Sequence, residues 1–342
     1  MKTIDLRSDT ITVPDEGMRK AMYDAEVGDD VYGEDVTVNE LQDLASSLTG
    51  KQASLFISSG SMGNLIPQFI IPERGSEVIA HRDSHIFHYE LSSMAAVAGL
   101  MPRPVDGKDG KLTLESVKNA MRPEIYYMPK TGLIEIENTH NAAGGTFYTT
   151  EELKALHGFS LSIDVPIHMD GARVFNASAT SGVSVKDIAS CCETITFCLS
   201  KGLGAPAGSM LCGTAEFIAE AKRVRKMFGG GMRQIGILAA AGIYALKNNV
   251  SKLEADHIHA RMIADAIRKS EILTLVNENI STNIVYFTAA EGCSLKTAAE
   301  KFHENGILIS GDSSVFRIVT HLDVSQEDIE RVCRFIENLK IY

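Results

Sequence analysis

The stretch FCLSKGLGAP (residues 197–206) ends an apolar run in a lysine, with two glycines and a proline close behind it. Such a run is typical of a buried strand, and a lysine charge removed from water is costly unless it is paired or neutralised. Lys201 could therefore be a surface residue on a loop, or a lysine that becomes a neutral amine or an imine. The remainder of the chain has to distinguish between these interpretations.

The composition is that of an ordinary globular protein. The chain has 342 residues, of which 44% are hydrophobic and 23% charged, so it can bury a sizeable core in two domains. Its net charge of −11 disfavours nucleic acid and anionic membranes as general partners. The N-terminus resembles no signal peptide, and no apolar window has the length of a membrane span. The six cysteines lack metal-ligand spacing, so we expect reduced thiols, no metal site and a cytoplasmic protein.

Short apolar strands alternate with helices over residues 1–245. The segment 37–50 is expected to be a helix, with Thr37 and Glu40 as a capping box and Gly50 at its end. Strands are expected at 53–57, 77–80, 133–137, 166–169, 194–199 and 209–213. This alternation predicts an α/β domain with a mainly parallel sheet.

The pattern changes after about residue 245. A long helix (250–269), strands at 282–287 and 315–319, and helices at 295–306 and from Ser325 follow one another. These elements predict a smaller α+β domain over residues 246–342.

Polar residues follow several of the expected strands, at the sheet edge where ligands collect in α/β proteins. In SSGSMGN (58–64), Gly60 and Ser61 could present backbone N–H groups to a phosphate, or could simply form a tight turn. Asp170 could pair with a ligand or cap a helix. His85, in DSHIFHYE (83–90), could be catalytic or structural. Lys201 ends a further strand.

Together these residues match the needs of pyridoxal phosphate, an electron sink held by a lysine Schiff base with an acidic partner on its ring nitrogen. Lys201 would supply the amine, whose pKa desolvation and neighbouring cations would lower. Asp170 would keep the ring nitrogen protonated, and His85 could stack on the ring. A lysine held as an imine has little reason to avoid the interior, which answers the question that Lys201 raises.

A family resemblance extends over almost the whole chain. It rests on IDLRSDT (4–10), EVGDDVYGED (26–35), SSGSMGN, DSHIFHYE, ENTHN (137–141), HMDGARVFNA (168–177), CLSKGLGAP (198–206), RKMFGGGMRQ (225–234) and FRIVTH (316–321). In this order they resemble the low-specificity L-threonine aldolases, which have the fold-type-I pyridoxal-phosphate-dependent transferase fold.

The resemblance implies roles for the cofactor residues named above. Lys201 would carry the Schiff base, Asp170 would face the ring nitrogen, His85 would stack on the ring, and Gly60 and Ser61 would hold the phosphate.

It also implies the substrate site. Arg173 would lie near the phenolic oxygen of the cofactor and the substrate carboxylate, which Ser8 and Arg317 would bind. Arg317 also interrupts an apolar strand, which either a bidentate carboxylate partner or an edge-strand arginine reaching solvent would explain.

The basic glycine-rich segment RKMFGGGMRQ is a further candidate. Three consecutive glycines (229–231) imply close backbone approach or positive φ. By the resemblance, Lys226 and Arg233 would reach the phosphate of a neighbouring subunit, in a homotetramer whose subunits share active sites. The alternative is a basic surface loop.

The chain departs from the family pattern at Tyr127, where the family usually has a histidine associated with the β-hydroxyl of the substrate. Tyrosine can donate a hydrogen bond to that hydroxyl but is a poor base, since its pKa is ordinarily about 10.

The implied reaction is retro-aldol cleavage of L-threonine or L-allo-threonine to glycine and acetaldehyde, as part of amino-acid metabolism and glycine biosynthesis. The base could be His85, Glu90 or an ordered water. The alternatives are another fold-type-I enzyme, either a β-eliminating lyase or an aminotransferase, and a non-catalytic binding protein.

Overall fold

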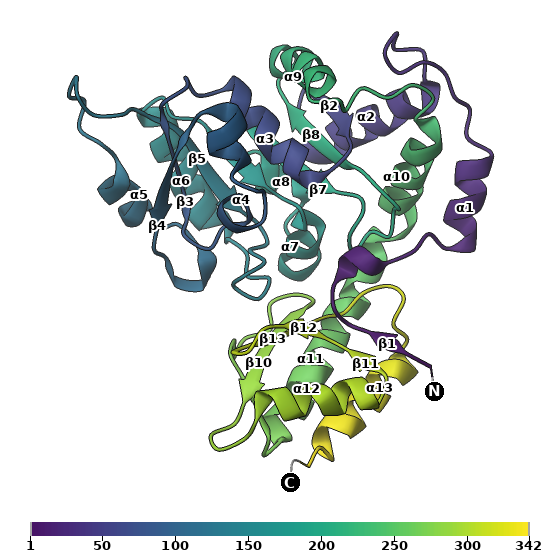
Figure 1. The fold of residues 1–342 in the computed structure, drawn as a ribbon. Helices are drawn as coiled ribbons and strands as arrows, with labels where there is room; N and C mark the ends of the chain where they lie inside the picture. Colours follow the sequence, from purple (N-terminus) through teal and green to yellow (C-terminus); the bar gives the residue numbers. More distant parts are fainter. Residues whose placement is uncertain (1, 341–342) are drawn as a thin grey trace.

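The computed structural model describes residues 2–340, which pack around two large hydrophobic cores. The larger core is built from residues between Met18 and Leu253. The second joins Ile4 and Leu6 to apolar residues of 260–339, so the start of the chain packs with its end. Figure 1 shows this arrangement, with both termini in the lower part of the molecule, beside the C-terminal elements.

The larger part contains a seven-stranded sheet in the order β2-β8-β7-β6-β5-β3-β4. Its strands are β2 (Ala53–Ile57), β3 (Glu77–His81), β4 (Met101–Val105), β5 (Thr131–Glu137), β6 (Ile167–Asp170), β7 (Thr194–Cys198) and β8 (Ser209–Gly213). Strand β8 alone runs opposite to the other six strands, so the prediction of a mainly parallel sheet is confirmed. Strands β3, β6, β7 and β8 are buried along their whole length, as expected of a sheet covered on both faces.

Helices and short helical turns connect and cover these strands. The helices are α1 (Glu16–Tyr23), α2 (Val36–Thr49), α3 (Gly60–Ile70), α4 (His85–His88), α5 (Leu114–Ala120), α6 (Thr150–Ser162), α7 (Val174–Ser181), α8 (Val185–Ala189), α9 (Ala215–Met227) and α10 (Gly236–Asn248). The short turns are η1 (Asp9–Ile11), η2 (Met94–Ala98), η3 (Lys108–Gly110) and η4 (Val250–Lys252).

Helix α2 begins one residue earlier than expected and is capped differently. Its N-cap is Asp35, whose side chain accepts a hydrogen bond from the Val38 N–H group. The expected cap, Thr37, instead donates its hydroxyl to the carbonyl of Glu26. The predicted end is confirmed, because Gly50 is the C-cap and adopts the left-handed conformation with φ of 67°.

The C-terminal part is the predicted smaller α+β unit. It contains α11 (Leu253–Lys269), α12 (Leu295–Glu304) and α13 (Gln326–Glu337), with a four-stranded antiparallel sheet in the order β12-β13-β10-β9. The strands of that sheet are β9 (Leu273–Leu275), β10 (Ile284–Ala289), β12 (Ser310–Gly311) and β13 (Phe316–Val319). Strand β1 (Ile4–Asp5) pairs in parallel with β11 (Ile307–Leu308). The predicted boundary at residue 245 falls inside α10 and stays a prediction.

The carboxyl-terminal loops of β3, β5, β6 and β7 meet the C-terminal sheet. Residues from these loops and from β10, β12 and β13 line one cavity between the two parts. Among the helices of residues 2–340, none combines the length and the apolar character that crossing a bilayer requires.

Candidate active site

Two adjoining cavities lie at the carboxyl ends of the parallel strands. The first has a volume of about 410 Å³, and its lining includes residues 58–61, Asp170 and Lys201. The second, of about 470 Å³, lies toward the C-terminal sheet. Thr10, His85 and Lys201 line both, so a group in the first cavity can meet a group in the second at Lys201. Both volumes suit small molecules.

The N-terminus of α3 forms one wall of the first cavity. Ser59 is the N-cap, and its hydroxyl accepts a hydrogen bond from the Met62 N–H group. The N–H groups of Gly60 and Ser61 belong to the first turn, which has no acceptor within the helix, so this wall is suited to an anion. A side chain at position 60 would meet Cys198, whose Sγ would lie 3.0 Å from the added Cβ. Glycine at 60 therefore lets the start of α3 pack against Cys198, which also lines this cavity.

Asp170 ends β6 and is buried, with hydrogen bonds to both carboxylate oxygens. Asn64 Nδ2 donates to Oδ2 at 2.8 Å, and the Ala172 N–H group donates to Oδ1 at 3.0 Å. Burial alone would raise the pKa of Asp170, but the charges of Lys201 and His85 and these hydrogen bonds hold it below its ordinary value. Asp170 is thus a buried carboxylate that stays ionised.

Asn64 links Asp170 to a second buried carboxyl group. Its Nδ2 also donates to Glu90 Oε1 at 2.9 Å, while its Oδ1 accepts from His168 Nε2 at 3.2 Å. Sequence reasoning missed Asn64, although it lies in the SSGSMGN segment. Its position could have indicated a role, because Asn64 lies one helical turn after Gly60 and so on the same side of the helix.

The imidazole of His85 is oriented by Glu90. Nδ1 of His85 donates to Glu90 Oε1 at 2.8 Å, and the Glu90 side chain is almost fully buried. Burial raises the pKa of Glu90. Burial acts to lower the pKa of His85, but the hydrogen bond to Glu90 and the charge of Asp170 raise it overall. Glu90 therefore contacts His85 rather than either cavity.

Lys201 lies in the turn after β7 and is half-buried. Its backbone carbonyl accepts hydrogen bonds from the Thr12 hydroxyl at 2.9 Å and the Gly204 N–H group at 2.8 Å, which fix the turn. The expected buried strand before Lys201 is β7. The Lys201 side chain lines both cavities.

Arg173 is buried in a bidentate ion pair with Asp9. Nε and Nη2 of Arg173 donate to the two Asp9 oxygens at 2.6 and 2.7 Å. Burial alone would raise the pKa of Asp9, but the charge and hydrogen bonds of Arg173 hold it well below its usual range. Asp9 belongs to the IDLRSDT motif, yet nothing local distinguishes it from Asp5 as the partner of an arginine 164 residues away.

Ser8 and Arg317 line the second cavity together with Arg173. Nη1 of Arg317 donates to Asn141 Oδ1 at 3.0 Å, and Nη2 donates to the Arg7 carbonyl at 3.1 Å. Arg317 pairs with Tyr286 across strands β13 and β10. The cavity therefore contains two arginines and a hydroxyl, a set suited to a carboxylate.

Three candidate residues lie elsewhere in the chain. Tyr127 lies between α5 and β5, where its side chain is 66% exposed and its ring packs edge-on against Tyr126. Lys226 lines a separate cavity at the end of α9, and Arg233 Nη1 donates to Asp29 Oδ2 at 2.8 Å.

The glycines at 229–231 show both of the features expected of them, a positive φ and a close backbone approach. Gly229 has a positive φ of 79°. A Cβ at Gly230 would lie 2.8 Å from atoms of Met62 in α3, so this backbone approaches α3 closely.

Comparisons with known proteins agree with this geometry. The family model described as beta-eliminating lyase matches residues 5–290. The low specificity L-threonine aldolase of Escherichia coli K12 is 42% identical over 330 residues, covering 96% of this chain and 97% of that protein. Low-specificity L-threonine aldolase 1 of Arabidopsis thaliana is 41% identical over 338 residues, covering 96% and 94%.

Solved structures share the fold. A putative L-allo-threonine aldolase from Listeria monocytogenes superposes with a TM-score of 0.83 at 20% identity, covering 98% of this chain and 96% of that one. The threonine aldolase of Leishmania major gives 0.84 at 20% identity and covers 98% of both chains.

Proposed function

The chain belongs to the low-specificity L-threonine aldolases, within the beta-eliminating lyase family, and on that premise we propose that it cleaves β-hydroxy-α-amino acids with pyridoxal phosphate as cofactor. L-threonine or L-allo-threonine would yield glycine and acetaldehyde. The observation that carries the proposal is that Lys201 and His85 line both cavities. A cofactor in the first cavity would meet an amino acid in the second.

The first cavity suits pyridoxal phosphate in each of its parts. Gly60 and Ser61 would hold the phosphate at the N-terminus of α3, Asp170 would face the ring nitrogen, and His85 would stack on the ring. Lys201 would hold the cofactor covalently through Nζ, as a Schiff base. When bound, the cofactor supplies an electron sink for the pair of electrons left on the α-carbon when the Cα–Cβ bond breaks.

The second cavity would bind and orient the amino acid. Arg317 and Ser8 would bind its carboxylate, with Arg173 beside it and near the phenolic oxygen of the cofactor. Asp9 neutralises Arg173 and fixes its guanidinium plane, so this arginine acts as a rigid donor. Such a clamp sets which bond of the α-carbon faces the electron sink, and orientation of this kind lowers the barrier by several kcal/mol.

Proton transfer would involve the His85 side chain. Its Nδ1 is taken up by Glu90, so Nε2 is the ring nitrogen left to exchange a proton, directly or through a water. Glu90 would then act through His85 rather than on the β-hydroxyl itself. A base at this step contributes typically about 10²–10⁴-fold.

Some candidate residues do not line the cavities at Lys201, and we propose that they contribute to the active site of a neighbouring subunit. We propose a cytoplasmic homotetramer in which Lys226 and Arg233 reach the phosphate of a neighbouring copy. For Tyr127 to reach a β-hydroxyl, either the segment between α5 and β5 changes position when substrate binds, or Tyr127 acts in a neighbouring copy.

The test begins with the purified protein and added pyridoxal phosphate. We expect a yellow protein whose colour borohydride fixes, and a Lys201→Ala variant without that absorption. Product analysis on L-threonine and L-allo-threonine, side by side, should detect glycine and acetaldehyde.

Two outcomes would refute this function. A colourless protein that stays inactive with added cofactor would exclude cofactor-dependent cleavage. Ammonia and a keto acid as products would indicate a β-eliminating lyase instead.

A further inference from the structure

Glu137 is a buried acidic residue that the proposed mechanism does not use. It ends β5, with 6% of its surface exposed, and lies between the loops that carry His85 and Asn141. Its Oε2 accepts the backbone N–H of His85 at 2.9 Å, and its Oε1 accepts the backbone N–H of Asn141 at 2.8 Å. One carboxyl group thus accepts hydrogen bonds from two separate loops.

The bond to His85 replaces a missing helix cap. His85 begins α4, whose N-cap residue Ser84 makes no side-chain capping bond. Among residues 2–340, the buried hydroxyl of Ser84 has no hydrogen-bond partner. A helix of four residues has little stability of its own, so the acceptor supplied by Glu137 from β5 fixes where His85 begins the turn.

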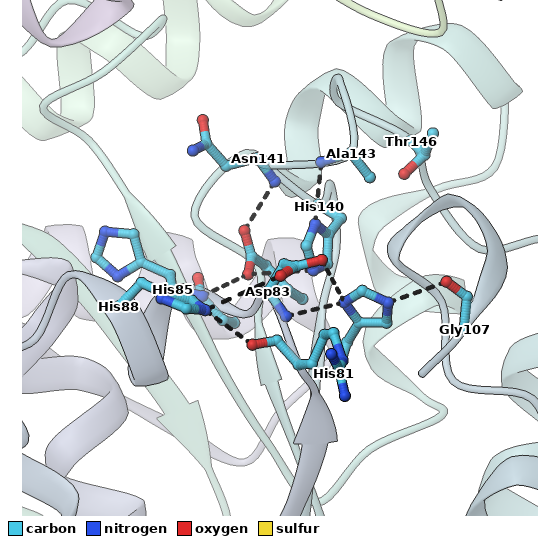
Figure 2. A network of polar contacts seen from close by, with 12 residues as sticks. His81, Asp83, His85, His88, Gly107, His140, Asn141, Ala143 and Thr146 are labelled. Atoms are coloured by element: carbon cyan, nitrogen blue, oxygen red, sulfur yellow. Dashed lines mark hydrogen bonds and ion pairs between the residues drawn. The ribbon is translucent and has the colours of Figure 1, made fainter. Parts of the chain in front are cut away.

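The bond to Asn141 continues to the arginine of the second cavity. The side chain of Asn141 accepts Arg317 Nη1 at 3.0 Å. Figure 2 shows His85, His140 and Asn141 close together, with a dashed contact from the backbone nitrogen of Asn141. The contacts therefore connect the backbone of His85 to the guanidinium of Arg317, which belongs to the other part of the molecule.

We propose that Glu137 is a positioning residue that sets His85 and, through Asn141, Arg317 relative to each other. This inference rests on the proposed function, in which His85 contacts the cofactor and Arg317 binds the substrate carboxylate. Its role differs from that of a merely structural buried acid. The loop it holds at His85 would contact the cofactor, and the loop it holds at Asn141 supports Arg317, which would bind the substrate.

His140 makes the two oxygens of Glu137 chemically distinct. The Ala143 N–H group donates to Nδ1 of His140 at 3.2 Å, and Nε2 lies 3.8 Å from Glu137 Oε2. Burial lowers the pKa of His140 to about 4, so the ring is neutral and carries its hydrogen on Nε2, facing Oε2. A glutamine at 137 keeps one acceptor oxygen and turns the other into an NH₂ donor, and the nearby His140 Nε2–H, although too far for a hydrogen bond, favours the oxygen at the Oε2 position.

Because the two oxygens differ, substitutions at 137 can separate the support of His85 from the support of Asn141. Glu137→Gln keeps the acceptor for His85 and loses the one for Asn141, so KM for L-threonine should rise about tenfold while the cofactor affinity of the apoprotein changes little. Asn141→Ala should reproduce that rise in KM. Glu137→Ala loses both acceptors, so it should also weaken the binding of pyridoxal phosphate by about tenfold.

Glu135 offers the matched control. It lies two residues earlier on β5, is also buried, and its Oε2 accepts only from Gln68 among the described residues. Glu135→Gln should leave both KM and cofactor affinity within twofold of wild type. In an Arg317→Ala background, Glu137→Gln should cause no further rise in KM.

Calorimetric titration with glycine separates this inference from the proposed function. Glycine has the carboxylate but no β-hydroxyl, so it reports on the clamp even if no threonine is cleaved. Absence of cleavage by the wild type refutes the function. Weaker glycine binding in Glu137→Gln, with urea stability like that of Glu135→Gln, supports the inference. Unchanged KM and glycine affinity in Glu137→Gln, or an equal loss in Glu135→Gln, overturns it.

Discussion

Replacing Asp9 by asparagine removes the charged partner of a buried arginine and leaves its charge uncompensated. Arg173 and Asp9 are 6% and 0% exposed, and they are joined by two hydrogen bonds of 2.6 and 2.7 Å. Removing one member of such a pair typically costs about 3–5 kcal/mol, because the other charge stays buried. This corresponds to a fall of about 10²- to 10⁴-fold in the folding equilibrium constant.

Urea unfolding of the cofactor-free protein, followed by circular dichroism, measures this loss. Asp5→Asn is the matched control, since Asp5 also pairs with an arginine, Arg7, but its side chain is 24% exposed and that of Arg7 52% exposed. A pair of that kind contributes at most about 1 kcal/mol. The double variant Asp9→Asn/Arg173→Met buries no uncompensated charge and should recover most of the stability lost in Asp9→Asn.

The dependence on pH gives a second check on the same pair. Burial acts to raise the pKa of Asp9, but Arg173 holds it well below its usual range. A group with a lowered pKa in the folded state contributes stability above its unfolded pKa, about 4, and loses it as the pH falls toward the folded value. The difference between wild type and Asp9→Asn should be full at pH 7 and should shrink below about pH 4. If Asp9→Asn is no less stable than Asp5→Asn at pH 7, the reasoning fails.

Two further predictions concern a buried acid and a buried glycine. Asp256 is 2% exposed, and burial raises its pKa to about 8, so its stabilising contribution is present below about pH 4 and is lost as the pH rises toward 8. Calorimetry should therefore find Asp256→Asn more stable than wild type by several degrees at pH 8, with the gain vanishing toward pH 4; a gain that does not vary with pH would contradict the assignment. Gly63 lies in α3, where an added Cβ would be 2.4 Å from Thr196 Cγ2, so Gly63→Ala should destabilise the protein by about 1–3 kcal/mol and weaken cofactor binding. Gly158→Ala in α6, where the added Cβ meets no atom within 4 Å, should be neutral or stabilising in the same urea titration.

The sequence by itself determined the order and type of most elements. Apolar runs such as 53–57 and 209–213 predicted β2 and β8 because side chains of a buried strand must be apolar on both faces. The polar residues at strand ends, among them Asp170 and Lys201, were predicted to lie together because the carboxyl ends of parallel strands share one edge. In the structure, both residues line the first cavity.

The tertiary structure decided which polar groups bind each other. Sequence patterns did not identify Asp9 as the partner of Arg173, Asn64 as the bridge between Asp170 and Glu90, or Glu137 as the acceptor for two loops. Even the N-cap of α2 is Asp35 rather than the predicted Thr37. A strand or helix follows from the local periodicity of apolar residues, whereas a hydrogen bond between distant residues depends on distances of a few ångströms that only packing sets.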